Sequence, residues 1–94
     1  MKVMAIGTLK PMTPEQRKQF MPEEVPATLK LYLEGKMEQF WLRDQMQGVF
    51  FLMNVDSVEE ATKLLNALPL TKGGMMSYQF MPVGPLLALG MLIK

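Results

Sequence analysis

The chain of 94 residues contains no cysteine and no histidine. Without cysteine there is no disulfide, no thiolate metal ligand and no cysteine nucleophile. Without histidine, the commonest general base and the commonest metal ligand of proteins are missing, and so is every Ser-His triad. We therefore expect no metal site.

Concentrated positive charge is also missing. Ten Lys and Arg stand against nine Asp and Glu, which gives a net charge of +1, and the basic residues are scattered from Lys2 to Lys94. A protein that binds nucleic acid usually needs a run or stripe of Lys and Arg that neutralises several phosphates. We therefore expect no nucleic-acid partner.

Long hydrophobic runs are scarce as well. The longest, at 86–93, is far shorter than the roughly 20 residues that cross a bilayer. The amino-terminal segment MKVMAIGTLKP has a short apolar stretch and no small-residue cleavage site of the kind that ends a secretion signal. These absences predict a cytoplasmic protein with no membrane partner.

Apolar residues, by contrast, are abundant. They make up 49% of the chain, with eleven Met among them, and the mean hydropathy is +0.10. A domain of this size buries only roughly 60–65% of the surface of its unfolded chain, so part of this apolar surface stays exposed. Because large exposed apolar patches mark interaction sites, we expect a homo-oligomer in which copies of the chain cover one another.

The first third of the chain predicts a strand at 3–9 and then a helix. Thr13 offers an N-cap, Pro14 fits the first helical position and Gln16 fits the third. Pro22 and Pro26 each lack a backbone N–H and clash with the preceding turn. The sequence therefore predicts a short helix near 14–20, an irregular segment at 21–24 and a second helix from 26 to 34, with Gly35 as its C′ residue.

Residues 36–43 and 48–55 read as two strands joined by the polar turn 44–47, which indicates a hairpin. If Arg43 pairs with Gly48, the period of two along each strand assigns every side chain to a face. We expect one face to pack in the core against the helices, and it carries Phe40, Leu42, Val49, Phe51 and Met53. We expect the other face to point away from the helices, and it carries Gln39, Trp41, Arg43, Phe50, Leu52 and Asn54.

The second half of the chain completes the pattern. Ser57 and Glu60 have the spacing of a capping box, and the helix that follows has to stop before Pro69. A last strand is expected at 75–81. The order is therefore β-α-β-β-α-β, a single α+β domain of the ferredoxin-like type over residues 1–94, with both helices on one face of an antiparallel sheet.

An open sheet face with Trp41, Phe50 and Leu52 needs a cover. Two such faces packed together form a dimeric α/β barrel with a cavity between the sheet and its partner. The apolar tail at 85–94 needs a cover too, and we expect it to pack on a neighbouring subunit. The alternative is that the tail folds back over its own sheet.

Several short segments together resemble the muconolactone isomerase family: Glu34-Gly35, Phe40-Trp41, Asn54-Val55-Asp56-Ser57-Val58-Glu59 and Leu68-Pro69-Leu70. The resemblance implies a ferredoxin-like protomer, dimers with facing sheets, an assembly of such dimers and a pocket at a subunit interface. It also implies a cofactor-free reaction that moves a proton along a small unsaturated lactone. Unlike the family, this chain has no His, carries two extra residues around Gly73-Gly74 and ends in an apolar tail.

The same resemblance implies a set of site residues. Glu24, counted back from Gly35, lines up with a family Glu and would carry the proton as a catalytic carboxylate. Arg43 is the second catalytic candidate, as a donor that stabilises an enolate oxygen. The candidate ligand-binding residues are Gln39, Trp41, Phe50 and Asn54.

Other interpretations of these residues stay open. Glu24 can be a carboxylate favoured near a helix start by the helix dipole, and Arg43 can be solvated or paired with Asp44. The whole protein can be a non-catalytic oligomer that binds a small apolar ligand passively. If Glu24 is buried, desolvation should raise its pKa toward the range that suits a general base.

Overall fold

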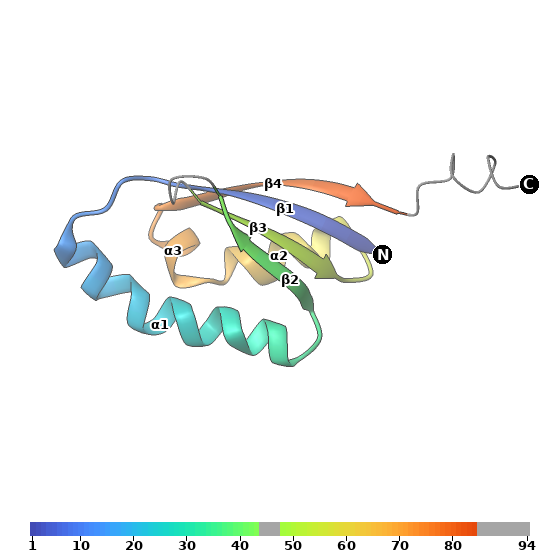
Figure 1. Cartoon of the computed structure of the whole chain (residues 1–94), viewed down its shortest axis with the longest axis horizontal. Helices are drawn as coiled ribbons and strands as arrows, with labels where there is room; N and C mark the ends of the chain where they lie inside the picture. Colours follow the sequence, from blue (N-terminus) through green and yellow to red (C-terminus); the bar gives the residue numbers. More distant parts are fainter. Residues whose placement is uncertain (44–47, 85–94) are drawn as a thin grey trace, which may run out of the picture.

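Four antiparallel strands form one sheet, and the helices lie on one of its faces (Figure 1). The computed structural model of the protein describes residues 1–43 and 48–84. The strand order is β2-β3-β1-β4, which confirms the predicted α+β, ferredoxin-like architecture. The elements are β1 (Lys2–Leu9), α1 (Pro14–Leu33), β2 (Met37–Leu42), β3 (Gly48–Asn54), α2 (Val58–Asn66), α3 (Pro69–Lys72) and β4 (Met76–Val83).

Helix α1 begins as its sequence predicts. The Thr13 side chain accepts a hydrogen bond from the Gln16 backbone N–H at 3.2 Å, and the Gln16 side chain accepts one from the Thr13 N–H at 2.9 Å. The helix ends at Leu33 with Glu34 as its cap, and Gly35, which has a φ of +78°, turns the chain away. There Lys36 N–H donates to the Leu31 carbonyl, the long bond of a Schellman cap, which only a left-handed residue such as glycine allows without strain.

The predicted break in this helix is wrong, because α1 runs without interruption from Pro14 to Leu33. Pro22 and Pro26 lie inside it, four residues apart and both solvent-exposed. Each proline leaves a carbonyl one turn earlier without its helical donor. Because Lys18 and Pro22, which own these carbonyls, are on the exposed side, water can hydrate them. The packing of Leu31 and Glu24 against the rest of the fold then holds the helix together.

The second helical region is divided where only one helix was expected. Helix α2 starts at a Ser57 cap, whose hydroxyl accepts from Glu60 N–H at 3.1 Å, and ends at Asn66, before Pro69 as predicted. Leu68 is extended, as residues that precede proline tend to be. Pro69 then opens the four-residue helix α3, which the sequence did not predict.

The hairpin register follows the prediction. Trp41 pairs with Phe50 and Leu42 with Val49, and Arg43 N–H donates to the Gly48 carbonyl at 2.9 Å. Val49, Phe51 and Met53 therefore face the helices, the last two with 4% and 0% exposure. Residues 44–47 and the tail 85–94, including its predicted packing on a neighbouring subunit, lie outside the described residues.

Two side chains predicted for the core are not buried. Phe40 and Leu42 lie on the helix side of β2, yet they are 51% and 69% exposed. The reason is that β2 is an edge strand and α1 leaves a pocket beside it. The buried core is instead built from Val3, Ala5, Leu31, Met37, Phe51, Met53, Val55, Ala61, Leu65 and Leu68.

The other face of the sheet carries apolar side chains with no helix over them in the part of the chain that the structure describes. Trp41 is 44% exposed and Met81 is 53% exposed. Their neighbours in the pleat are only partly buried. We call this surface the open face, and it comprises Met4, Ile6, Trp41, Phe50, Leu52 and Met81.

Candidate functional site

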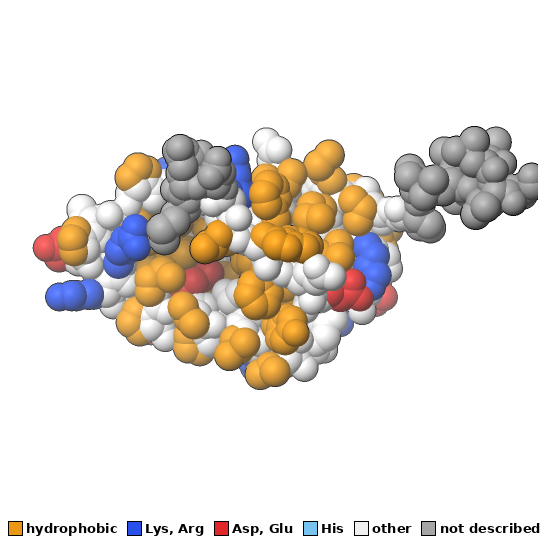
Figure 2. Space-filling view, in the orientation of Figure 1, with side chains coloured by type: hydrophobic (Ala, Val, Ile, Leu, Met, Phe, Trp, Pro, Cys, Tyr) orange, Lys and Arg blue, Asp and Glu red, His pale blue; other side chains and the backbone are white. Residues whose placement is uncertain are grey.

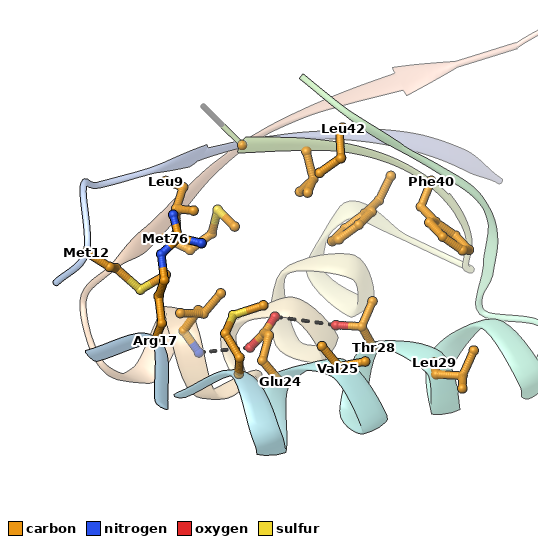
Figure 3. Close-up of a pocket in the computed structure, with 15 residues that line it drawn as sticks. Leu9, Met12, Arg17, Glu24, Val25, Thr28, Leu29, Phe40, Leu42 and Met76 are labelled. Atoms are coloured by element: carbon orange, nitrogen blue, oxygen red, sulfur yellow. Dashed lines mark hydrogen bonds between the residues drawn. The ribbon is translucent and has the colours of Figure 1, made fainter. Parts of the chain in front are cut away.

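A pocket of about 310 Å³ lies between helix α1 and the sheet. Its walls come from α1, β2, β3 and the ends of β1, α3 and β4, and nearly all of its lining is aliphatic, aromatic or Met (Figure 3). Figure 2 shows the same side of the molecule with hydrophobic side chains gathered around a hollow in which acidic atoms are visible. The exposed rim is apolar too, and it includes Val25, Leu29, Phe40 and Leu42.

Among the residues that the structure describes, Glu24 is the only acidic side chain in the lining of this pocket. It is 5% exposed, the one charged residue among the buried side chains of the described chain. Its Oε1 accepts a hydrogen bond from Leu70 N–H at 2.9 Å, and its Oε2 accepts one from the Thr28 hydroxyl at 3.4 Å (Figure 3). Leu70 is in the first turn of α3, and backbone N–H groups in the first turn of a helix have no carbonyl acceptor within that helix.

Burial raises the pKa of Glu24 above its ordinary value of 4.5, because the apolar surroundings disfavour the charged form. The hydrogen bonds from Leu70 and Thr28 act in the opposite direction, since they stabilise the carboxylate. The net effect is a carboxyl group that holds its proton more tightly than an exposed glutamate. A carboxylate of this kind is a better proton acceptor than an exposed one.

Tyr78 lies on the helix side of β4, close enough to Glu24 to be influenced by its charge. Burial raises its pKa, the negative charge of Glu24 raises it further, and the nearby Thr71 side chain opposes the rise. The hydroxyls of Thr71 and Tyr78 are both buried, and within the described residues neither of them makes a hydrogen bond. Tyr78 is therefore a neutral phenol at neutral pH.

The polar residues of the pocket share one face of α1. The polar residues are Arg17, Glu24 and Thr28. With the apolar Met21 they follow one another at intervals of four, three and four residues, which places them in line along a helix. Arg17 and Thr28 were not among the predicted site residues. The spacing could have revealed them, but only if α1 is read as one helix through both prolines.

The other predicted site residues lie on the far side of the sheet. Arg43 donates to the Gly7 carbonyl at 3.1 Å and to the Thr8 hydroxyl at 2.8 Å, and its guanidinium lies 5.8 Å from the centre of the Phe50 ring. Trp41 pairs with Phe50 across the strands. The structure thus brings Arg43, Trp41 and Phe50 together on the open face, apart from Glu24.

Gln39 and Asn54 are also outside the pocket. Gln39 pairs with Leu52, and Asn54 pairs with Lys2 at the end of β1. Both side chains are exposed on the open-face side of the sheet. Within one protomer neither of them can contact a molecule that is bound beside Glu24.

Two further observations on the described residues concern metal-ligand clusters and membrane-spanning helices. Within residues 1–43 and 48–84, no group of three His, Cys, Asp or Glu side chains is placed to hold a metal ion. No helix in the same residues combines the length and the hydropathy needed to cross a bilayer.

At the level of sequence, no protein-family model and no curated protein matches the chain. Several solved structures share its fold. Muconolactone isomerase superposes with a TM-score of 0.76 and 23% identity, covering 90% of each chain. The 5-chloro-2-hydroxyhydroquinone dehydrochlorinase TftG from Burkholderia phenoliruptrix AC1100, in complex with 2,5-dihydroxybenzoquinone, superposes with a TM-score of 0.72 and 16% identity, covering 89% of this chain and 94% of that one. The chain therefore has a muconolactone isomerase-like fold.

Proposed function

We propose that this protein is a small, cofactor-independent isomerase in which Glu24 moves a proton along a lactone or another unsaturated carbonyl compound. One observation carries the proposal: a single buried carboxylate faces a pocket that is otherwise almost entirely apolar. The likeness to muconolactone isomerase, and to a dehydrochlorinase that was solved with a small carbonyl compound, supports this reaction class.

The proposed reaction consists of two proton transfers. A Glu24 oxygen takes a proton from a carbon next to the carbonyl group, and the electron pair of that C–H bond enters the conjugated system as an enolate. The carboxyl group exchanges this proton with solvent and then delivers a proton to another carbon of the system, so that the double bond moves and the composition of the substrate is unchanged. The raised pKa makes Glu24 a stronger base than an exposed glutamate.

Thr28 is the donor that can stabilise the enolate. Its hydroxyl is in the lining of the pocket, next to the carboxylate. The 3.4 Å contact with Glu24 is long for an O–H···O bond, so the hydroxyl can rotate toward a bound ligand at little cost. A donor held at the developing charge lowers the barrier to enolate formation.

Association through the open face is part of the proposal. Trp41, Phe50 and Leu52 form an apolar surface that a second copy of the chain can cover, as in a dimeric α/β barrel. Arg43, Gln39 and Asn54 lie on that side, so any role they have in binding belongs to a cavity between two sheets. Glu24 works in a different cavity, inside each protomer.

The test is proton exchange into a small substrate. The protein is incubated in D2O with a panel of neutral unsaturated five-membered lactones, and deuterium incorporation and double-bond migration are followed by NMR. We expect exchange with the unmodified protein and a loss of about 10²-fold to 10⁴-fold in Glu24→Gln. The matched control is Glu23→Gln, the same change at an exposed neighbour, which should leave the rate unchanged.

Glutamine is the sharpest replacement here because its side-chain oxygen can still accept from Leu70 N–H. Glu24→Gln should therefore fold normally while it lacks a base. Exchange at an undiminished rate in this variant would overturn the assignment of Glu24.

One observation favours the alternative of passive binding. Both carboxylate oxygens already have donors within the protein, as expected of a side chain whose task is to anchor α3 to α1. Under that reading a lactone binds with equal affinity to the unmodified protein and to Glu24→Gln, and neither exchanges a proton. Binding and exchange measured on the same samples separate the two functions.

A further inference from the structure

Neither the fold nor the proposed proton transfer accounts for the hydroxyl of Tyr78. Within the described residues it is one of two buried side-chain oxygens that make no hydrogen bond, and the other is Thr71 Oγ1. A buried hydroxyl without a partner lowers the stability of a fold, and phenylalanine would fill the same space without that loss. Packing alone therefore does not explain a tyrosine at this position.

The ring of Tyr78 is held in a narrow space on the helix side of the sheet. Gly7 of β1 pairs with Tyr78 on one side and with Val49 of β3 on the other. A Cβ at Gly7 would lie 2.8 Å from Tyr78 Cε1 and 2.9 Å from Val49 Cγ2, so a larger residue would collide with the ring. The ring of Phe51 lies beside it, with its centre 6.1 Å away. Tyr78 therefore leans across β1 toward side chains of β3 that line the pocket.

Glu24 belongs to the same buried region. Its Oε1 accepts a hydrogen bond from the N–H of Leu70, and Thr71 is the next residue along α3. The charge of Glu24 and the side chain of Thr71 are both close enough to Tyr78 to influence the phenol. One carboxylate and two hydroxyls without partners are therefore neighbours beside a pocket with a largely apolar lining.

Glu24 can accept more hydrogen bonds than it receives. A carboxylate has about four acceptor positions. Within the described residues Glu24 has two donors, the Leu70 N–H at 2.9 Å and the Thr28 hydroxyl at 3.4 Å (Figure 3). When Thr28 turns to the enolate in the proposed reaction, the carboxylate loses the second of these donors. Tyr78 is protonated, so its hydroxyl can donate in place of Thr28.

We propose that Tyr78 is a positioning residue whose hydroxyl donates to the Glu24 carboxylate when Thr28 turns to the substrate. The Tyr78 oxygen then accepts a hydrogen bond from Thr71, so that both buried hydroxyls gain a partner in the same step. Hydroxyl donors linked in this way strengthen one another in a medium of low dielectric constant. This inference rests on the proposed function for the movement of Thr28, and it does not depend on the identity of the substrate.

The test is a titration of Glu24 in variants that lack one donor or both. The protein is labelled with 13C-glutamate, the carboxyl carbons are followed by NMR against pH, and the Glu24 signal is the one that Glu24→Gln lacks. Thr28→Val and Tyr78→Phe should each raise the pKa of Glu24 only slightly, because the other hydroxyl still donates. The double variant should raise this pKa by about one pH unit, the effect of losing a donor to a buried carboxylate.

The matched control is Tyr32→Phe, the same change at the other tyrosine, which is 44% exposed. Combined with Thr28→Val, it should leave the titration as it is in Thr28→Val alone. Thr71→Val combined with Thr28→Val should give a rise smaller than that caused by Tyr78→Phe. A rise in the double variant no larger than the sum of the two single changes would overturn the proposal, because hydroxyls that do not replace each other act independently.

Other charges near Glu24 are the same in all of these variants. Within the described residues Arg17 of α1 is the only other charged side chain in the pocket lining, and the four strands contribute only uncharged side chains to it. Lys72, at the end of α3, is exposed. The titration therefore reports on the hydroxyl donors.

The pH profile of proton exchange is the second measurement. With a lactone bound, Thr28 faces the substrate, so Tyr78→Phe alone should shift the rise in exchange rate to higher pH by about one unit. A non-additive titration without any exchange refutes the isomerase alone. Exchange together with an additive titration refutes the role of Tyr78 alone.

Discussion

The two faces of the sheet have similar side chains but different surroundings. On the helix side, Phe51 and Met53 are 4% and 0% exposed, while on the open face Trp41 and Met81 are 44% and 53% exposed. One chain can bury only the first face with the helices it has. The comparison teaches that the helix side supplies both the core and a pocket within one protomer, whereas the open face has no helix over it among the described residues.

The same division separates the candidate residues. Glu24, Arg17 and Thr28 belong to the helix side, and Arg43 and Trp41 belong to the open face. A ligand that contacts members of both groups would have to pass through the sheet. Each face therefore has to be tested by itself, and the following predictions run from the largest expected effect to the smallest.

Adjacent phenylalanines provide the most direct test of the two faces. Phe51→Ala opens a cavity in the core and should lower the free energy of unfolding by about 3–5 kcal/mol. Phe50→Ala removes the same atoms from the open face and should cost clearly less in a dilute, dissociated sample. Urea denaturation at low protein concentration measures both. Equal losses would contradict the distinction between the faces.

A charge on the open face should act on association. Trp41→Asp places a carboxylate in the middle of the proposed contact and should weaken self-association by about 2 kcal/mol or more, the cost of losing a central interface residue. Light scattering over a range of concentrations measures the mass. Leu33→Asp, a similar change at a position 75% exposed on α1, is the control and should leave the mass unchanged. A monomer at all concentrations before any substitution would contradict the prediction.

Glu24 also has a structural role that can be separated from its chemistry. Glu24→Ala leaves the buried Leu70 N–H without an acceptor and should lower the free energy of unfolding by about 1–3 kcal/mol. Glu24→Gln keeps an acceptor and should cost less. Chemical denaturation of both variants checks this, and equal costs would show that the bond to Leu70 does not matter for stability.

The smallest expected effect is the pH dependence of stability. The raised pKa means that the folded chain binds the Glu24 proton more tightly than the unfolded chain does. As pH rises from 4.5 through the raised pKa, the contribution of this group to the free energy of unfolding should therefore fall. The chain has no His, so few other groups titrate near neutral pH. Urea denaturation at several pH values should show a flatter profile for Glu24→Gln, and identical profiles would contradict the shift.

The local parts of the fold could be predicted from the sequence because their causes are local. The Thr13 and Ser57 caps depend on spacing within four residues, and the pairing of Trp41 with Phe50 depends on the hairpin and the period of two. Continuity of α1 could not be predicted in this way. It depends on the packing of the helix against the sheet, which offsets the cost of two prolines.

The pocket was harder to predict than the fold. The sequence suggested a cavity between two sheets, which stays a prediction because it needs a second copy of the chain. The pocket that the structure shows lies between α1 and its own sheet. Phe40 and Leu42 lie on the rim of this pocket because β2 is an edge strand. The sequence of β2 alone does not predict that position, because strand order depends on the whole fold. Glu24 was found by counting back from Gly35, and its catalytic role stays a prediction.

The prolines of α1 also affect how the pocket opens. Pro22 and Pro26 each remove one backbone hydrogen bond on the same side of the helix, and Glu24 lies between the two prolines in the sequence. The part of α1 that lines the pocket around Glu24 therefore has the fewest backbone hydrogen bonds of the helix. The hydrogen bond from Leu70 N–H to Glu24 connects this part of α1 to α3. Amide hydrogens of this middle segment should exchange with solvent sooner than those toward Leu33. A bulky ligand can then enter the pocket when α1 bends at this segment, while the sheet stays rigid.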